Sequence, residues 1–423
     1  MKKNKKVLII FIILGIALLS IGVYFAYTII NENNNGNKKY LSIDLKGDKE
    51  VILKWKDKTY TDEGAIAKYK DEDISKNIEV TNNVDYEKVG EYKYTYTIKY
   101  KKVKKTIERK VKIIDDVKPE LKLNGPDNNF LILGNEYKDY GATATDNYDG
   151  DITKNIEVDT SQLNKDKLGK YKVIYKVKDS SGNENTLERN IEVKKKSSAD
   201  QKVAVLNYHY LYKDKTDFKE KCDSQEICFP VDRFKEQLKY LEDNGFTTLT
   251  IHEFVQWMYG EIDIPEKSVL LTFDDGGWGT ATDRGNFLIP SLEEYKAHAT
   301  LFLIVGFWDK ALYESPYLDL QSHTYALHYE AKCGHRSKVN CVSYEELVSD
   351  LKRSAYVLGS KDSFCFPYYD YTEESIKAVK EVGFRVAFIG AQRKASRSND
   401  KYKIPRYTIY NSTSMESFKQ MVN

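Results

Sequence analysis

The longest apolar stretch of the chain lies close to its beginning. Residues 7–30 form an almost unbroken apolar run, and a helix needs about 20 such residues to cross a bilayer. Four lysines precede the run, and residues 31–37 after it carry a single charge, which is negative. Because positively charged flanks stay in the cytoplasm, we expect residues 1–6 to form a cytoplasmic tail and residues 7–30 a transmembrane signal anchor in the cell membrane, with the rest of the chain outside the cell.

A cleaved signal peptide is the alternative interpretation of this run. The apolar core of a signal peptide usually has about 7–15 residues, and a cleavage site with small residues follows it. The run here is longer and no such site follows it, so we favour the uncleaved anchor. The sequence contains no second apolar run of this length, which predicts a single-pass membrane protein.

The next part of the chain contains one pattern twice. Two segments recur with little change: DISKNIEV at 73–80 as DITKNIEV at 151–158, and VGEYKYTYTI at 89–98 as LGKYKVIYKV at 168–177. Each copy consists of short segments in which apolar and polar positions alternate, as they do in half-buried strands. Polar turns such as DSSGNEN separate these segments. The pattern therefore predicts two small β-sandwiches, over residues 40–115 and 116–194.

After a charged linker the pattern changes for the rest of the chain. In residues 203–423, strand-like apolar runs alternate with segments of helical periodicity. We expect helices near residues 232–244, 343–359 and 372–383, which end at Gly245, Gly359 and Gly383, as helices often end at a glycine. Strands that alternate with helices predict an α/β domain, either a barrel or a doubly wound sheet.

Charge and cysteine content narrow the possible functions. The chain has 66 Lys and Arg against 64 Asp and Glu, a net charge of +2, which argues against a nucleic-acid binder held by bulk positive charge. Outside the cell cysteines can form disulfides, and Cys222 with Cys228, or Cys333 with Cys341, could each close a short loop. Cys365 is left over. Spacing alone does not distinguish disulfides from buried thiols, so both possibilities remain.

An acidic cluster lies in a turn of the second predicted sandwich. Asp146, Asp149 and Asp151 could bind calcium through their carboxylate oxygens. Asp, Asn and Gly are equally at home in a simple turn. We favour the turn, because the first repeat lacks the full cluster.

Polar side chains follow several strand-like runs of the α/β domain. VAVLNY is followed by His209, SVLLTF by Asp274 and Asp275, and SFCFP by Tyr368. Active sites of α/β barrels assemble at the carboxyl ends of the strands, which makes these residues candidates for a site. Adjacent carboxylates at a strand end point to different sides, so one can bind a metal while the other faces a substrate. The alternative is an Asp-rich turn into the glycines that follow.

Two histidines can complete a metal site with one of these carboxylates. The chain has 6 histidines, and His323 and His328 are the natural pair. Their i,i+5 spacing places them about 140° apart on an ideal helix, so at least one must lie on a loop or a distorted turn. Taken singly, each fits an ordinary polar position. One carboxylate and two imidazoles with open positions are typical of Zn²⁺ acting on water, although Co²⁺, Ni²⁺ or Fe²⁺ fits the same ligands.

The motifs TFDDG, SHT…H and FPYYDY together resemble those of the polysaccharide deacetylases (carbohydrate esterase family four, the NodB-homology domain). The resemblance covers about residues 203–410 and implies a distorted (β/α)7 barrel. It also implies these roles: Asp274 as catalytic base; Asp275, His323 and His328 as metal ligands; and the backbone N–H of Tyr368 as a donor to the oxyanion. The two sandwiches resemble immunoglobulin-like modules of bacterial surface proteins.

The resemblance implies hydrolysis of the acetamide of N-acetylglucosamine (GlcNAc) units in an extracellular or cell-wall polysaccharide. The i,i+5 spacing of the two histidines looks like the subgroup that acts on poly-N-acetylglucosamine, whereas peptidoglycan deacetylases usually carry i,i+4. We therefore expect poly-GlcNAc as the substrate, with peptidoglycan as the alternative.

The chain departs from the family pattern in three places. Cys365 stands where the family often has an arginine that pairs with the catalytic Asp, and Tyr369 replaces a common glycine. The late Leu-x-His of the family, its usual general acid, is absent. His209 remains as a candidate to protonate the leaving amine, with a structural role as the alternative. We expect three histidines to be non-catalytic: His252, His298 and His335.

These departures leave a second hypothesis open. The same fold could be a catalytically weak or inactive carbohydrate-binding protein on the cell surface. The complete set of expected metal ligands argues against it.

Overall fold

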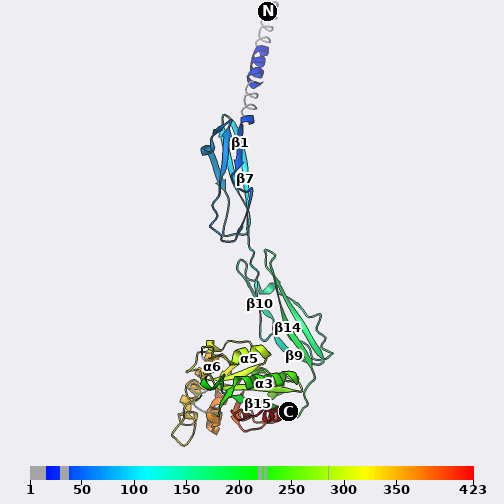
Figure 1. The fold of residues 1–423 in the computed structure, drawn as a ribbon, viewed down its shortest axis with the longest axis vertical. Coiled ribbons are helices and arrows are strands. Elements are labelled where there is room, and N and C mark those ends of the chain that lie inside the picture. Colours follow the sequence, from blue (N-terminus) through cyan, green and yellow to red (C-terminus); the bar gives the residue numbers. More distant parts are fainter. Residues whose placement is uncertain (1–15, 29–37, 218–221, 223–225, 284) are drawn as a thin grey trace, which may run out of the picture. The chain divides into compact units, whose positions relative to one another are not determined.

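The computed structural model describes residues 16–28, 38–217, 222, 226–283 and 285–423 of the chain (Figure 1). Residues 16–28 are helical. Among the described residues, no helix combines the length and the apolar character needed to cross a membrane. The expected anchor at residues 7–30 lies partly outside the described residues, so it stays a prediction.

The chain folds into two compact units. The first, called here the sandwich unit, comprises Met1–Glu120, Thr145–Ile152 and Lys178–Asn185. The second, called here the barrel unit, comprises Leu121–Ala144, Thr153–Val177 and Thr186–Asn423. Two loops of the second repeat thus belong to the same unit as the first repeat.

The first repeat forms two facing sheets, with strand orders β1-β3-β4 and β2-β7-β6-β5. Its elements are β1 (Leu41–Leu45), β2 (Glu50–Lys54), β3 (Ala65–Tyr69), β4 (Glu72–Asp73), η1 (Ser75–Asn77), β5 (Ile78–Asn82), β6 (Gly90–Tyr100) and β7 (Val103–Ile114). The alternating pattern of the sequence is visible in β6, where Tyr96 and Ile98 are buried and Lys93 and Lys99 are exposed.

The second repeat has the same strand order, β11-β10-β8 and β12-β13-β14-β9. Its elements are β8 (Glu120–Leu123), β9 (Asn128–Ile132), β10 (Ala142–Asp146), β11 (Gly150–Asp151), η2 (Thr153–Asn155), β12 (Glu157–Asp159), β13 (Gly169–Lys178) and β14 (Glu184–Lys194). In both repeats one outer strand pairs in parallel with the last strand, β2 with β7 and β9 with β14. The shared topology confirms the prediction of two β-sandwiches.

Each sandwich buries one arginine at the same position of the repeat, Arg109 and Arg189. Arg109 forms an ion pair with Asp62 and donates to the carbonyl oxygen of Asp48 at 2.8 Å. Arg189 donates to the carbonyl oxygens of Asn124 and other residues, so both arginines tie loop backbone to a central strand. A buried guanidinium needs such a full set of acceptors.

Replacing Arg109 by Ala should destabilise the sandwich unit by about 3–5 kcal/mol, because it leaves the carboxylate of Asp62 without its partner in a largely buried position. The matched control is Lys93→Ala, which removes an ion pair with Glu108 that is half exposed and should cost about 0–1 kcal/mol. Urea unfolding followed by circular dichroism measures both. Equal losses for the two variants would contradict the structural role of Arg109.

The rest of the barrel unit is a closed parallel barrel of seven strands. They are β15 (Lys202–Tyr208), β19 (Ser268–Asp275), β20 (Ala299–Leu303), β21 (Leu318–Ser322), β22 (Ser363–Cys365), β23 (Val386–Gly390) and β25 (Ile404–Thr408). The barrel closes because β15 pairs in parallel with both β19 and β25. Only one residue pair joins β21 to β22, which is the distortion. The predicted distorted (β/α)7 barrel is confirmed.

Helices follow most of the barrel strands (Figure 1). They are α3 (Val231–Asp243), α4 (Ile251–Tyr259), α5 (Leu288–Tyr295), α6 (Tyr344–Leu358), α7 (Glu373–Val382) and α8 (Met415–Val422). The helices expected from the sequence correspond to α3, α6 and α7. Gly359 and Gly383 end α6 and α7 in the left-handed conformation, where glycine carries no steric penalty.

Shorter elements and two disulfides complete this unit. The short elements are β16 (Tyr210–Tyr212), β17 (Cys228–Pro230), β18 (Thr247–Thr248), β24 (Ala395–Ser396), η3 (Lys310–Tyr313), η4 (Lys338–Asn340) and η5 (Pro367–Tyr369). Cys222 is bonded to Cys228 and Cys333 to Cys341, while Cys365 is a free, buried thiol. The disulfide interpretation of the cysteine spacing is therefore the right one.

Candidate active site

Strand β19 delivers two adjacent carboxylates to the carboxyl end of the barrel. All eight of its residues are buried, and it ends on Asp274 and Asp275. The chain then turns through Gly276 and Gly277, whose φ angles are 86° and 96°. A Cβ on Gly277 would lie 2.8 Å from the ring of Trp308. Glycine is thus required both by the backbone angle and by the space beside the site.

Asp275 faces two histidines. Its Oδ1 lies 3.3 Å from Nε2 of His323 and 3.1 Å from Nε2 of His328. The other ring nitrogen of His323, Nδ1, lies 2.9 Å from the carbonyl oxygen of Cys365. Because a carbonyl only accepts, Nδ1 carries the proton and Nε2 is left with its lone pair toward Asp275. Three donor atoms of metal-ligand type therefore converge, within 4.8 Å of one another.

The two histidines meet on a loop, as their spacing requires. His323 follows β21 directly, and the next residue, Thr324, has a φ of 79°, an unusual conformation for a β-branched residue. Asp350 on α6 accepts the backbone N–H groups of Tyr325 at 2.7 Å and Ala326 at 2.8 Å. These contacts fold the loop back, so that His328 returns to the side of His323.

Asp274 has a different partner, which the sequence did not reveal. Arg406 on β25 donates from Nη1 to Oδ1 and from Nη2 to Oδ2, both at 2.7 Å. Asn207 on β15 adds a hydrogen bond to Oδ2 at 3.1 Å. Burial alone would raise the pKa of Asp274, but the guanidinium of Arg406 overcomes it and holds that pKa below its usual value. Asp274 is therefore ionised and fixed in orientation.

Arg406 on β25 thus supplies the guanidinium that position 365 lacks. Cys365 lies beside the ion pair, and its Sγ accepts from Nη2 of Arg406 at 2.8 Å. Burial raises the pKa of Cys365 well above its usual value, so it stays a neutral thiol. The second departure, Tyr369, contacts the same group, since the guanidinium lies 5.4 Å from its ring centre. Its hydroxyl accepts from Asn207 at 2.6 Å.

Asp275 has one further contact that sequence reasoning missed. The hydroxyl of Tyr210 on β16 donates to its Oδ2 at 3.1 Å, which leaves Oδ1 to the histidines. Burial would raise the pKa of Asp275, but the imidazoles of His323 and His328 beside it hold that pKa well below its usual value. Burial would likewise lower the pKa of His328, and the Asp275 carboxylate raises it instead. A divalent cation would compete with that proton for the same position.

Tyr368 and His209 also lie at the site. Tyr368, in η5, has a φ of 57°, and its ring centre lies 4.8 Å from that of His328. His209 follows β15, and burial lowers its pKa even though Asp275 and Asp274 act in the opposite direction. Its Nδ1 has no hydrogen-bond partner in the part of the chain that the structure describes. The expected roles of both residues stay predictions.

The remaining histidines lie elsewhere in the barrel unit. His252 on α4 is exposed and pairs with Asp362 at 3.1 Å. His298 is buried against the ring of Tyr317, and His335 lies 3.3 Å from Asp370. None of these three belongs to the ligand cluster around Asp275.

Comparison with known protein families now identifies the domain. Residues 261–387, which include every expected site residue except His209, match the family model described as polysaccharide deacetylase. The chain carries a polysaccharide deacetylase domain. Enzymes of this family hydrolyse amide bonds of acetylated sugars, so the chain is a hydrolase. Residues 43–113 and 121–193 match the Ig-like domain of bacterial surface proteins.

The chain is also similar to individual proteins. A protein of Bacillus subtilis (strain 168) named "Putative polysaccharide deacetylase YxkH" is 24% identical over 222 residues, which are 51% of this chain and 74% of that protein. The solved deacetylase PplD from Streptococcus pyogenes, in complex with acetate, is 20% identical with a TM-score of 0.45, covering 53% of this chain and 99% of that one. IcaB from Ammonifex degensii is 24% identical with a TM-score of 0.42, covering 53% and 96%.

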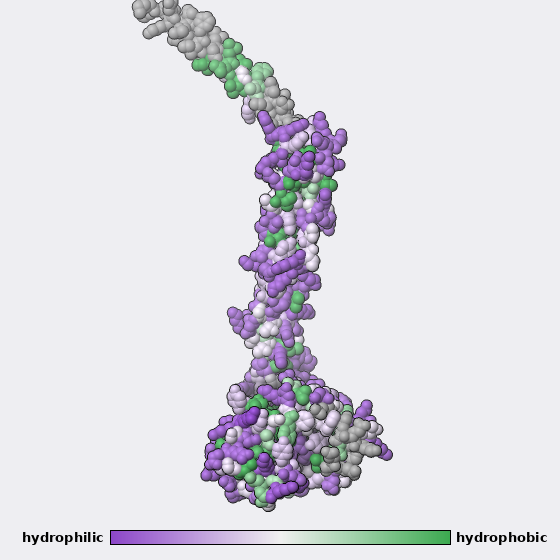
Figure 2. Space-filling view, turned by 90° about the vertical axis from the view of Figure 1, so that its left-hand side faces the viewer, coloured by the Kyte–Doolittle hydropathy of each residue, from purple (hydrophilic) through white to green (hydrophobic). Residues whose placement is uncertain are grey.

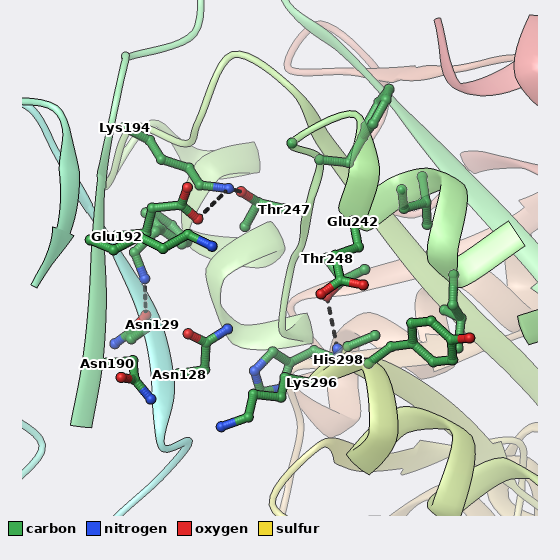
Figure 3. Close-up of a pocket in the computed structure, with 18 of the residues that line it drawn as sticks. Asn128, Asn129, Asn190, Glu192, Lys194, Glu242, Thr247, Thr248, Lys296 and His298 are labelled. Atoms are coloured by element: carbon green, nitrogen blue, oxygen red, sulfur yellow. Dashed lines mark hydrogen bonds and ion pairs between the residues drawn. The ribbon is translucent and has the colours of Figure 1, made fainter. Parts of the chain in front are cut away.

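A separate cavity lies in the same unit, away from the deacetylase residues. It has a volume of about 440 Å³ and is lined by residues of β9, β14, α3 and α5 (Figure 3). Polar side chains dominate the view, among them Lys194, which donates to Thr247 at 2.8 Å, and His298. No residue of the Asp275 cluster lines this cavity, so the two places are distinct.

The Asp274–Arg406 ion pair yields a prediction for the deacetylase. Replacing Arg406 by Ala should lower activity by about 100-fold or more, because Asp274, the expected base, then loses the charge that keeps it ionised. Arg406→Lys keeps the charge but not the two parallel hydrogen bonds and should be intermediate. Acetate release from a GlcNAc oligomer is the measurement.

The matched control is Arg397→Ala, which removes a partly exposed arginine outside the site and should leave the rate unchanged. Circular dichroism must show that each variant is folded. Wild-type activity in folded Arg406→Ala would contradict the assigned role.

Proposed function

We propose that this chain is a divalent-metal-dependent N-deacetylase that removes acetyl groups from GlcNAc units of an extracellular or cell-wall polysaccharide. The observation that carries the proposal is the pairing of two different environments at one strand end. Asp274 is held by a permanent cation, Arg406, while Asp275 faces two imidazole nitrogens. One carboxylate is thus prepared as a base and the other as a ligand.

Asp275, His323 and His328 would hold the metal. One carboxylate and two imidazoles suit Zn²⁺, and also Co²⁺, Ni²⁺ or Fe²⁺. Such an ion supplies Lewis acidity and a lowered pKa for water in its vicinity. The hydrogen bonds from His323 to the Cys365 carbonyl and from Tyr210 to Asp275 orient the ligand atoms, as second-sphere contacts do in metalloproteins.

The other residues of the site handle protons and charge. Asp274 accepts the proton of the attacking water as general base. The backbone N–H of Tyr368 donates to the oxyanion that forms on the acetamide carbon. The C–N bond then breaks, acetate leaves, and the sugar keeps an amine. His209 is the candidate to pass a proton to that amine. Because burial lowers its pKa, it would do so with a proton gained during the reaction.

The alternative of an inactive carbohydrate-binding protein loses one of its two arguments. Its support was Cys365 in place of the family arginine and the absence of the late Leu-x-His. Arg406 supplies the missing guanidinium from β25, which removes the argument from Cys365.

Replacing Asp274 by Asn should reduce acetate release from a GlcNAc oligomer by about 100- to 10,000-fold, because it removes the general base without changing the side-chain shape. His323→Ala should be equally inactive. The matched control is His252→Ala, which changes an exposed histidine that is not part of the ligand cluster and should keep the wild-type rate. Unchanged release by folded Asp274→Asn would overturn the proposed function.

We favour poly-GlcNAc over peptidoglycan as the polymer. Support comes from the i,i+5 spacing of His323 and His328, which places both on a loop rather than on one helix face. The near-neutral chain, with a net charge of +2, also suits an uncharged polymer.

Acetate release from purified β-1,6-linked poly-GlcNAc and from peptidoglycan, assayed side by side, tests this preference. We expect the rate on poly-GlcNAc to exceed that on peptidoglycan by at least about tenfold, a difference of about 1.4 kcal/mol in transition-state binding. The reverse order, with full activity on peptidoglycan, would contradict it while leaving the deacetylase function intact.

We also propose that the chain is held at the cell membrane by residues 7–30, with the deacetylase domain outside the cell. Support comes from the described part of this segment, residues 16–28, whose large apolar side chains are exposed (Figure 2). A continuous apolar surface of this kind favours contact with lipid.

A further inference from the structure

Three aspartates of the sandwich unit, none of them part of the candidate active site, lie together. Asp115 follows β7, Asp146 ends β10, and Asp179 follows β13. Each contributes a carboxylate oxygen to a group whose atoms lie within 4.8 Å of one another. Their exposed fractions are 6%, 8% and 5%, so three carboxylates are removed from water in one place.

Two of these carboxylates are only half satisfied. Oδ1 of Asp115 accepts from the backbone of Val117 at 3.2 Å, and Oδ1 of Asp146 accepts from the backbone of Tyr148 at 2.8 Å. The Oδ2 atom of each is buried and has no hydrogen-bond partner within the described residues. A buried carboxylate oxygen without a partner is strongly disfavoured, which points to a ligand that occupies this position.

No side-chain cation in the described part of the chain forms an ion pair with Asp115, Asp146 or Asp179. The negative charges of the three carboxylates repel one another when they are buried together. Asp179 is nevertheless held in place, since its Oδ1 and Oδ2 accept from the backbone and side-chain nitrogens of Asn183, each at 2.8 Å. Within the described residues, Asp115 and Asp146 thus each offer an oxygen without a partner beside a third carboxylate that is fixed in place. A metal ion would supply the missing positive charge.

We propose that Asp115, Asp146 and Asp179 bind one Ca²⁺ ion. The group offers oxygen atoms and neither histidine nor cysteine, which favours a hard cation over Zn²⁺. Ca²⁺ takes 6–8 oxygen ligands in flexible geometry, so backbone carbonyls or water complete its shell. The ion joins the end of β7 to the two loops of the second repeat that belong to the sandwich unit.

The first repeat shows that the fold does not require these acids. Asp146, which pairs with Gly150, is equivalent to Tyr69 of the first repeat, which pairs with Glu72. Asp179, directly after β13, is equivalent to Tyr100, the last residue of β6. The rings of Tyr69 and Tyr100 pack with their centres 5.1 Å apart. Where one repeat places an aromatic contact, the other places two carboxylates, which is a substitution suited to binding a cation.

This ligand set differs from the acidic cluster of the sequence. Asp149 has a structural role, since its carboxylate accepts hydrogen bonds from the backbone N–H and the hydroxyl of Ser180, both at 2.7 Å. Asp151 lies on β11 opposite Thr145. Only Asp146 of the sequence cluster belongs to the proposed site, and its partners come from segments more than 30 residues away on each side.

Terbium luminescence tests the proposal on the full chain, because Tb³⁺ replaces Ca²⁺ and is excited through nearby aromatic rings. Tyr148, two residues from Asp146, packs against Trp55 with ring centres 5.1 Å apart. We expect Tb³⁺ to give a sensitised signal that Ca²⁺ displaces below about 1 mM and that Mg²⁺ displaces less well. Absence of a Ca²⁺-displaceable signal would overturn the proposal.

Variants locate the ion. Asp115→Asn and Asp146→Asn should each weaken Ca²⁺ binding by about tenfold or more, because each removes a charged ligand. The matched control is Asp116→Asn, a neighbouring aspartate that is partly exposed and paired with Lys54, which should bind like the wild type. Equal binding by all three variants would overturn the site.

A measurement on unmodified protein covers the case in which a variant does not fold. Added Ca²⁺ should raise the thermal unfolding midpoint of the wild type and of Asp116→Asn, because an ion that binds the folded state stabilises it. An unchanged wild-type midpoint at millimolar Ca²⁺ would contradict the proposal. Deacetylase activity is not the readout, so failure here is distinguishable from failure of the proposed function.

Discussion

Asp274 and Asp275 end one buried strand as two adjacent carboxylates, and each needs a positive charge to remain ionised away from water. The barrel meets the two needs differently. Asp274 receives a fixed cation, the guanidinium of Arg406, through two hydrogen bonds of 2.7 Å. Asp275 faces the nitrogens of His323 and His328, which bind a proton or a metal ion, and the neutral hydroxyl of Tyr210. The proposed division between base and ligand follows from this difference in partners.

Cys365 and Tyr369 fill the space around the guanidinium of Arg406. Since Arg406 enters from β25, position 365 no longer needs a long cationic side chain, and a neutral thiol fills the space beside the ion pair. Tyr369 occupies the other side of the guanidinium. Two departures from the family pattern are therefore parts of one rearrangement, in which the charge beside Asp274 is kept and its source has moved.

The sequence revealed the residues whose chemistry is local. The repeats, the barrel and the cluster of Asp275, His323 and His328 follow from periodicity, strand ends and a family motif. Arg406 could not be found in this way, because its pairing with Asp274 across 132 positions depends on the closure of the barrel between β25 and β15. The only local signal was an arginine inside a strand-like apolar run. The same holds for Asp115 and Asp179, which no spacing rule connects to Asp146.

The central claim is that Asp275, and not Asp274, receives the divalent cation. Anomalous diffraction from crystals of the protein grown with Zn²⁺, recorded on both sides of the zinc absorption edge, tests it most directly. The account predicts a peak about 2.0–2.2 Å from Oδ1 of Asp275 and from Nε2 of His323 and His328. A peak between Asp274 and Cys365, or no peak at the end of β19, would contradict it.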